Sequence, residues 1–342
     1  MSIDVQFLDP RHDAAPPDWE DWRVEAGLWA NWSWPLLRAG AWTSRSPLLI
    51  AVLHRPGGEV AGVVASTVSG LRPGRARFCA EHGWPKPGYL HVQAPQSSAQ
   101  PGWWFGTADS AERAALFRAY SRAACRELGA SALAVLWRQV DKADLALLPR
   151  RMLTRPTEPI AVLDTPFTDT DTWLRGLRKS RRQDLRRISR GLSADPDLEV
   201  RVGLAADLVN EAELVRLARL NHDKHDTSTV DRHTGLRTVA WQHAAVQSPD
   251  VAVVAYRNRA GRLLGAGMIL DHPSRPIWLT WGAESVEQGG RRHLYFDLYS
   301  RVVARTIAQG QQAVVLGKGM AELKADLGAR LVPQYAVVCL AA

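Results

Sequence analysis

Apolar residues in the second half of the chain follow two different spacings. A repeat of about three to four positions predicts helices, and short runs rich in Val, Ile, Leu and Trp predict buried strands. In chain order the pattern predicts helices over 210–222 and 234–247, strands over 251–259, 263–272 and 276–283, a helix over 293–310, a strand over 313–317, a helix over 320–328 and a strand over 332–340. Gly310 and Gly328 stand where two of these helices would end.

The first half of the chain shows approximately the same order of elements. The pattern predicts a Trp-rich helix over about 17–38, strands over 48–54, 59–68, 75–81 and 88–94, a helix over about 109–128, a strand over 132–137, a helix over 142–151 and a strand over 159–165. Residues 117–122 and 296–301 both read F-x-x-Y-S-R, and each segment lies in the helix before a buried strand. A repeated element order with a repeated motif indicates an internal duplication.

The predicted fold class is α/β (α+β), with two tandem domains that each contain a mixed, mostly antiparallel sheet flanked by helices. We expect an N-terminal domain over 1–168, a basic connecting helix over 169–192 and a C-terminal domain over 193–342, because a turn-rich segment lies near 165–172. A chain of 342 residues suits two domains, and its 46% apolar and 23% charged content is that of a globular protein.

Several classes of protein are disfavoured by what the sequence lacks. The three cysteines are scattered without the spacing of a metal site, and the N-terminus has no secretory pattern. No run of about eighteen apolar residues exists, which a membrane-spanning helix would need. We therefore expect a cytoplasmic protein without a metal site or a membrane span. The sequence indicates nothing about the oligomeric state.

The positive charge of the chain is concentrated in one segment. Residues 175–190 carry eight basic residues against one acid, a net +7, while the whole chain carries a formal +8. Four arginines in this segment are spaced by four positions and line one face of the predicted helix, with Lys179 beside them: Arg178, Arg182, Arg186 and Arg190. Like charges in a row repel, so such a face is typical of a helix that binds phosphates; the alternative is a solvated linker helix.

Arg181 differs from the other arginines of this segment. It falls within the apolar stripe of the helix, between Leu177 and Leu185. A guanidinium in that position needs a buried partner or a pocket that holds an anionic ligand. The alternative is that the side chain extends to the edge of the apolar surface.

Three motifs in the second half of the chain resemble those of a known family. They read K-S-R-R-Q-D-L-R from Lys179 to Arg186, T-I-A-Q-G from Thr306 to Gly310, and L-K-A-D-L-G from Leu323 to Gly328. The element order of each half resembles the GNAT acyltransferase fold. Two copies joined by a basic helix resemble the Fem family, the peptidyltransferases that take amino acids from aminoacyl-tRNA. The resemblance covers about 173–340 by motif and 1–165 by element order alone.

The sequence departs from the family pattern at three positions. The first motif is one residue longer than usual and has Asp184 where Asn is usual, Thr306 stands where Ala is usual, and Leu323 replaces Phe. The resemblance implies acyl transfer onto an amine, with tRNA as the partner that carries the acyl group. It also implies a functional lysine at Lys324, whose ammonium could stabilise the oxyanion of the transfer. The alternative for Lys324 is an exposed helix lysine.

The sequence does not favour coenzyme A as the donor. A CoA-dependent GNAT enzyme holds pyrophosphate in an R/Q-x-x-G-x-G/A loop, and the corresponding segment here, residues 288–293, has Arg291 and His293 at the small positions. We therefore expect no cofactor, with aminoacyl-tRNA as co-substrate and acyl-CoA as the less favoured donor. Arg291 and Arg292 precede a helix and are added to the candidate phosphate contacts.

The remaining candidates concern catalysis and the amine-bearing acceptor. Asp297 could accept a proton, or form a salt bridge. Candidate substrate contacts are Trp281 and Glu284 at the end of a strand, Tyr299 in the repeated motif, and His222 and His225 in the segment N-H-D-K-H-D. For the two histidines, metal binding is the weaker alternative. The sequence does not identify the acceptor, for which a cell-wall precursor and a small metabolite both stay open.

Tryptophans crowd the first 42 residues of the chain: Trp19, Trp22, Trp29, Trp32, Trp34 and Trp42. Core packing explains most of them, and some could line an apolar acceptor pocket. Two other functions stay open. One is an N-acyltransferase that uses acyl-CoA or a carrier protein, and the other is a non-catalytic RNA-binding protein with degenerate GNAT halves.

Overall fold

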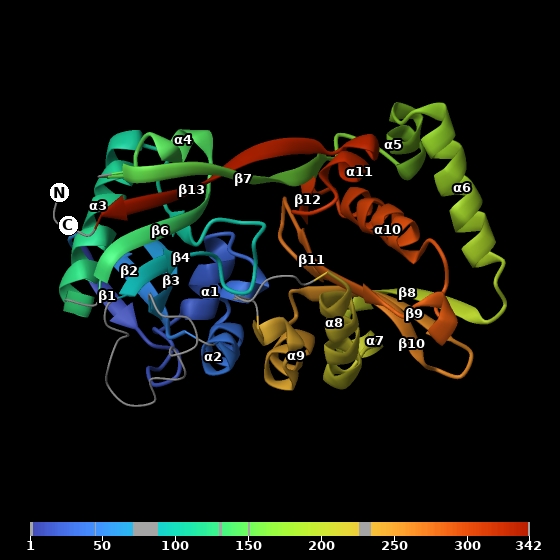
Figure 1. Ribbon diagram of the computed structural model, residues 1–342, viewed down its shortest axis with the longest axis horizontal. Helices are drawn as coiled ribbons and strands as arrows, with labels where there is room; N and C mark the ends of the chain where they lie inside the picture. The colour runs from blue at the N-terminus through green and yellow to red at the C-terminus, as the bar shows by residue number, and fades with distance from the viewer. Residues whose placement is uncertain are drawn as a thin grey trace.

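The computed structural model describes residues 3–44, 46–70, 88–129, 132–149, 151–225 and 234–340. Within these residues the chain forms one mixed sheet in the order β1-β2-β3-β4-β6-β13-β7-β12-β11-β10-β9-β8, with β5 paired to β3 (Figure 1). The strands are β1 Asp4–Leu8, β2 Leu48–His54, β3 Val60–Gly70, β4 Gly88–Val92, β5 Trp103–Phe105, β6 Ala132–Val140, β7 Arg151–Asp164, β8 Leu198–Leu204, β9 Val251–Asn258, β10 Leu263–Leu270, β11 Ile277–Ala283, β12 Ala313–Gly317 and β13 Arg330–Leu340.

Helices cover both faces of this sheet. They are α1 Trp19–Glu25, α2 Trp34–Thr43, α3 Ser110–Leu128, α4 Lys142–Leu145, α5 Thr170–Gly176, α6 Lys179–Ser193, α7 Ala205–Leu208, α8 Glu211–His225, α9 Val239–Val246, α10 Leu294–Ala308 and α11 Ala321–Asp326, with short 3-10 turns at η1 Ala30–Trp32, η3 Thr234–Arg237 and η4 Val286–Gln288. The expected α/β (α+β) class, a mixed sheet flanked by helices, is confirmed.

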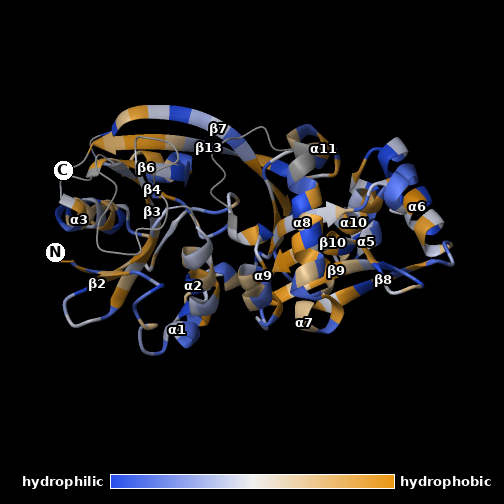
Figure 2. Ribbon diagram, turned by 60° about the horizontal axis from the view of Figure 1, so that its bottom comes forward, coloured by the Kyte–Doolittle hydropathy of each residue, from blue (hydrophilic) through white to orange (hydrophobic). Residues whose placement is uncertain are grey.

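Strand alternation distributes the apolar side chains between the two faces. In β9, Val251 and Val253 join the cluster under α8 and α9, while Ala252 and Val254 join the cluster under α5, α6 and α10. Successive strand residues point to opposite faces, so a strand that is apolar throughout requires cover on both sides. Figure 2 shows β9 and β10 as hydrophobic strands lying between these helices.

The last strand of each half crosses into the other half. β7 lies between β13 and β12, and β13 lies between β7 and β6. The pairing of β7 with β13 runs from Arg151↔Cys339 to Val162↔Arg330. Figure 1 shows the two long strands side by side across the top of the molecule. The sheet is therefore continuous across the two halves, and its two central strands hold the halves together.

The structure corrects several predicted boundaries. The connecting segment expected as one helix over 169–192 is two helices, because Leu177 is extended (φ −83°, ψ 156°) and separates α5 from α6; the side chain of Asp169 caps α5. The single helix expected over 17–38 is two helices, separated at Gly27 (φ 67°). The helix expected over 142–151 ends at Leu145, and β7 begins at Arg151.

Three strands were missed by the sequence pattern. β1 and β5 are short, and β8 alternates between exposed and half-buried positions on the edge of the sheet. The pattern of a buried strand is weak in such segments, because an edge strand buries little of its surface. The strand predicted over 75–81 lies outside the described residues.

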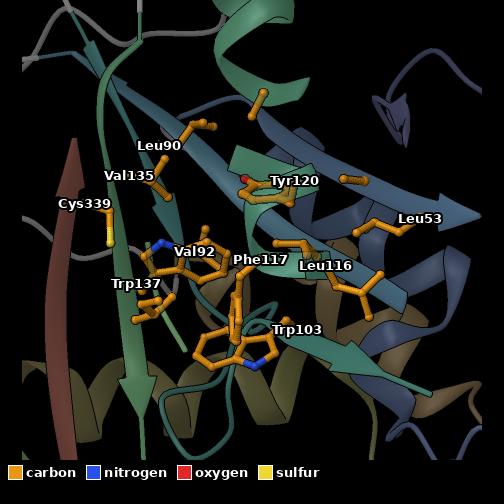
Figure 3. Close-up of a cluster of buried hydrophobic side chains, with 14 of the residues drawn as sticks. Leu53, Leu90, Val92, Trp103, Leu116, Phe117, Tyr120, Val135, Trp137 and Cys339 are labelled. Carbon is orange, nitrogen blue, oxygen red and sulfur yellow. The ribbon is translucent and has the colours of Figure 1, made fainter. Parts of the chain in front are cut away.

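The core of the N-terminal half is organised around Trp137 on β6. Its ring is fully buried and contacts three aromatic rings from edge to face: Trp103 at 5.3 Å, Phe117 at 5.0 Å and Tyr120 at 5.4 Å between centroids (Figure 3). This geometry aligns the positive ring edges with the negative ring faces. The cluster joins α3 to the strand that pairs with β13.

Replacing Trp137 should test how strongly the fold depends on this cluster. Trp137→Ala should destabilise the protein by about 3–5 kcal/mol, because a large cavity would remain in a packed core. Trp42→Ala is the matched control, since the Trp42 side chain is 45% exposed. Chemical denaturation followed by circular dichroism measures both variants. An equal midpoint for the two variants would contradict this account of the core.

Candidate functional site

Lys324 is buried, so it is not an exposed helix lysine. It lies on α11, directly after the turn that follows β12, and only 3% of its surface is exposed. Its Nζ donates to the carbonyl oxygens of Leu316 at 2.7 Å and Lys318 at 2.8 Å, and lies 3.5 Å from that of Gly317. Burial lowers the pKa of Lys324 to about 8, because the charged form loses hydration.

The turn between β12 and α11 brings these carbonyls around the amine. Gly317 and Gly319 adopt φ values of 72° and 79°, and Met320 adopts 50°. Left-handed backbone is unfavourable for residues with a side chain, so glycine is well suited to two of the three positions. The G-K-G-M segment thus folds the backbone back over the end of β12, where the α11 lysine reaches it.

A second lysine of this turn was missed by the sequence analysis. The Nζ of Lys318 lies 3.4 Å from Oγ1 of Thr157 on β7. Burial and the nearby guanidinium of Arg138 lower the pKa of Lys318 to about 8. Glu158 lies on the same side of the turn, where its Oε1 accepts from the backbone N–H of Gly319 at 2.6 Å. The scarcity of lysine, six residues against 37 arginines, was a signal that could have drawn attention to Lys318.

A cavity of about 500 Å³ opens between the two halves of the sheet. Val315 of β12 and Gln334 of β13 line it, and their directly paired neighbours on β7 are Val162 and Thr157. Directly paired residues project to the same face of a sheet. Lys318, whose amine contacts Thr157, therefore reaches the face of the sheet that the cavity occupies.

Arg181 joins α6 to the α10 and α11 side of the molecule. One of its guanidinium nitrogens lies 3.6 Å from Oδ2 of Asp326, and its Cζ lies 5.7 Å from the ring centre of Phe296. The side chain is 26% exposed, so it is partly buried and also reaches solvent. Its partner is an acid of α11, two positions from Lys324.

The basic face of α6 lies at one end of the molecule (Figures 1 and 2). Leu185, Ile188 and Leu192 pack inward, and the basic residues lie on the remaining surface. Arg178 is the N-cap residue of α6, and its side chain is 84% exposed although it lies 4.0 Å from Asp326. Lys179 is exposed as well, and so is Arg190, whose Nε donates to the carbonyl of Arg186 at 3.3 Å.

Other basic residues of this segment have contacts within the protein. Arg186 pairs with Asp171 at 2.9 Å, and Arg182 donates to the carbonyl of Arg175 at 3.3 Å. Exposed ion pairs of this kind contribute little to stability. They can therefore be exchanged for contacts with an external anion.

Three candidate residues instead form ion pairs inside the fold. Asp297 accepts hydrogen bonds from Tyr256 Oη at 2.9 Å and Arg301 Nε at 2.6 Å. Glu284 is buried and pairs with Arg216 and Arg262.

Arg291, the third of these residues, pairs with Asp195 at 2.6 Å and Asp197 at 2.8 Å. The hydrogen bond from Arg291 holds the pKa of Asp195 below its usual value. Charged side chains that are already paired within the protein are not free to bind a ligand, because a ligand would first have to displace their partners.

The remaining candidates are not gathered around Lys324 by direct contacts. Tyr299 is fully buried in the core beneath α5, and its Oη lies 3.5 Å from the carbonyl of Leu327. Trp281 is half-buried beside Tyr295, and Arg292 is exposed. His222 is half-buried on α8.

His225 is the last residue of α8, and its side chain and Asp226 lie outside the description. In the described part of the chain, no three His, Cys, Asp or Glu side chains are placed to hold a metal ion. None of the described helices combines the length and the apolar character needed to cross a lipid bilayer.

The fold is shared with solved structures of low sequence identity. The C-terminal domain (DUF2156) of a putative lysylphosphatidylglycerol synthetase from Agrobacterium fabrum has a TM-score of 0.58 at 14% identity, over 89% of this chain and 86% of that chain. FemX has a TM-score of 0.54 at 10% identity, over 86% and 90%. A tandem GNAT protein from the clavulanic acid biosynthesis pathway has a TM-score of 0.50 at 13% identity, over 100% and 99%.

These likenesses define the class of fold. The chain has a tandem GNAT-like fold, as its order of elements predicts. Neither a family model nor a curated protein sequence matches it. Identities of this size carry no residue roles from one protein to another, so the chemistry must be argued from this chain's own residues.

The pH dependence of stability should reveal the buried amine. Lys324 has a folded pKa of about 8 against an ordinary value of 10.5. Between these values the unfolded chain binds the extra proton, so the free energy of unfolding rises with pH across this window. The melting temperature of the wild type minus that of Lys324→Met should therefore increase from pH 8 to pH 10.5. A difference that stays constant across the window would contradict the lowered pKa.

Proposed function

We propose that the protein is an acyltransferase that moves an aminoacyl group from aminoacyl-tRNA to an amine-bearing acceptor. The observation that carries this proposal is the buried amine of Lys324, held by backbone carbonyls at the end of β12. The position matches the lysine motif by which the sequence resembles the Fem family. The fold shared with FemX and with the lysylphosphatidylglycerol synthetase domain supports the same class of reaction.

The proposed chemistry is attack of a neutral amine on the ester of the charged tRNA. A C–N bond forms, the ester C–O bond breaks, the amine loses a proton and the ribose hydroxyl of the tRNA regains one. The tetrahedral intermediate carries an oxyanion that a fixed ammonium can stabilise. Two N–H groups of Lys324 make short bonds, while the contact to Gly317 is 3.5 Å. The third N–H is therefore the one available to an oxyanion.

Lys318 is the candidate for the proton transfer. The attacking amine must lose its proton, and a base with a pKa near the working pH accepts and releases protons most effectively. Burial gives Lys318 a pKa of about 8, and its amine reaches the face of the sheet that the cavity occupies. This role replaces the one considered for Asp297, whose carboxylate is engaged by Tyr256 and Arg301.

The exposed basic face of α6 is the proposed contact with tRNA. Phosphate contacts depend on accessible positive charge rather than on shape alone. Arg178, Lys179 and Arg190 are exposed, and Arg182 and Arg186 lie on the same helix with weak internal contacts. Because charged tRNA is a cytoplasmic substrate, the proposal places the protein in the cytoplasm.

Two features of the structure disfavour a CoA pyrophosphate. At the N-terminus of α3, the carboxylate of Asp109 accepts from the backbone N–H of Glu112 at 2.7 Å. An anion at a helix N-terminus occupies the place that a phosphate would use. At the corresponding turn before α10, Arg291 is engaged by Asp195 and Asp197. An acyl-CoA or carrier-protein donor and a non-catalytic RNA-binding role are outcomes that the following experiment separates.

Incubation with a mixture of charged tRNAs and amine acceptors tests the proposal. Loss of the aminoacyl ester and formation of an amide should both require intact RNA and Lys324. Lys324→Met should lose at least about a hundredfold in turnover, because the oxyanion loses its ammonium. Its melting temperature serves as the folding control. Product from acyl-CoA after ribonuclease treatment would contradict the tRNA donor, and tRNA binding without product would indicate the non-catalytic alternative.

The salt dependence of tRNA binding tests the α6 contact. The log–log slope should be roughly −3 to −5 for about four to six phosphate contacts, and Arg178→Gln or Arg190→Gln should each make it shallower by about one. The matched control is Arg126→Gln, which changes an exposed arginine on α3 at the other end of the molecule (Figure 1). Equal slopes for all three variants would place the RNA elsewhere.

A further inference from the structure

Two buried carboxamides in the central cavity have no hydrogen-bond partner among the described residues. Gln100 is 2% exposed and Gln139 is 3% exposed, and both line the cavity between the halves. The side-chain oxygen and nitrogen of each residue are unpartnered. An unsatisfied buried amide destabilises the fold, because it has given up its hydrogen bonds to water without replacement. Two such groups in one cavity indicate that a ligand supplies the partners.

The backbone of Gln139 is also strained. Its φ is 56°, in a region that residues with a side chain rarely occupy. The residue lies near the end of β6, where the pairing with β13 shifts register between Tyr335 and Val337. Such bulges redirect a side chain relative to the regular alternation of a strand. Strain of this kind is typical of functional positions, and here it accompanies a side chain that lines the cavity.

The remaining lining of the cavity is mainly apolar, from tryptophans and aliphatic residues, and carries no excess charge. The indole N–H of Trp103 donates to Asp144, and that of Trp29 donates to the carbonyl of Arg275, so these two rings offer apolar surface rather than donors. The carboxylate of Asp144 is bound by Arg113, and Arg330 is bound by Asp164.

The whole lining contains two aspartates and two arginines. The positive and negative side chains are therefore equal in number, and one of each already has a partner within the protein. The other two charged residues, Asp141 and Arg275, are exposed, so the buried part of the lining offers no unpaired counter-charge and favours an uncharged ligand.

We propose that this cavity binds an uncharged secondary amide carried on an apolar group, with Gln100 and Gln139 as its hydrogen-bond partners. A carboxamide offers a donor and an acceptor, as an amide ligand does, so each glutamine can exchange hydrogen bonds with the ligand. The apolar part packs between the tryptophans, and a volume of about 500 Å³ is within the range of small-molecule sites. The inference rests on the proposed function only in assigning this amide as one group of the acceptor, whose amine would lie outside the cavity.

A pair of isosteric probes tests the amide. N-benzylacetamide and benzyl acetate share their shape, but only the amide has an N–H donor. N-benzylacetamide should bind about tenfold more tightly, because the ester leaves a buried acceptor unpartnered. Binding is followed by the indole N–H resonances of the four tryptophans in the lining, Trp29, Trp32, Trp103 and Trp104, in ¹⁵N-labelled protein. Equal affinities of the two probes, or shifts confined to other indoles, would overturn the proposal, as would tighter binding of benzylammonium or phenylacetate.

Substitutions separate a ligand role from a structural one. Gln100→Leu and Gln139→Leu should abolish the preference for the amide while leaving the melting temperature equal or higher, because an unsatisfied polar group is removed. Gln139→Met provides a flexible alternative where Leu does not fit. Gln312→Leu, at an exposed position, is the control and should keep the preference. A lower melting temperature with an unchanged amide preference would show that the two glutamines bind structural water, and the proposal would be wrong.

The outcome is independent of the test for acyl transfer, since no RNA or donor is present in the binding measurement. Amide binding without aminoacyl transfer contradicts the proposed function alone. Transfer by a protein that binds the amide and the ester equally contradicts this inference alone.

Discussion

The pairing of β13 with both β6 and β7 is the interaction on which the arrangement of the molecule depends. β6 and β7 follow each other in the N-terminal half, whereas β13 ends the C-terminal half, and their hydrogen bonds make one sheet from two halves. The cavity lies beside this junction and is lined by residues of β6, β7, β12 and β13. A displacement of β13 would expose Gln139 and separate Gln334 from Thr157. The geometry of the site therefore follows from strand pairing rather than from a local motif.

The lysines at the end of β12 show how backbone structure determines side-chain chemistry. Lys324 is held by carbonyl oxygens, so its amine remains in place although burial disfavours the charged form. A pKa of about 8 makes both protonation states accessible near neutral pH. The left-handed residues of the turn, Gly317 and Gly319, provide this environment. Two amines therefore meet at one strand end, one from the turn and one from the following helix, and these are the groups to which we assign the proposed donor and proton-acceptor roles.

The distribution of acidic partners determines which arginines can meet an external anion. Arg291 and Arg181 stood out in the sequence, yet each has an acid nearby in space: Asp195 and Asp197 for the first, Asp326 for the second. Arg178 also lies 4.0 Å from Asp326 and Arg190 donates to the carbonyl of Arg186, but both side chains are exposed on α6, so their charge remains accessible to solvent. The exposed positive charge proposed to meet tRNA is therefore narrower than the basic composition of the segment, and it lies on one helix at the end of the molecule.

The sequence alone determined the features that depend on local spacing. Four features are readable from neighbouring positions: the apolar runs of β9 to β11, the helices that end near Gly310 and Gly328, the repeated element order and the charge of α6. Tertiary structure decided which candidates are free to act. Glu284 pairs with Arg216 and Arg262, which are distant in the sequence. Asp297 accepts from Tyr256 on β9 as well as from Arg301, one turn further along α10. Burial against β7 lowers the pKa of Lys318. Nothing in the sequence marks the two cavity glutamines. They are buried without hydrogen-bond partners only in the folded chain, where β6, β13 and the loop before β5 lie together.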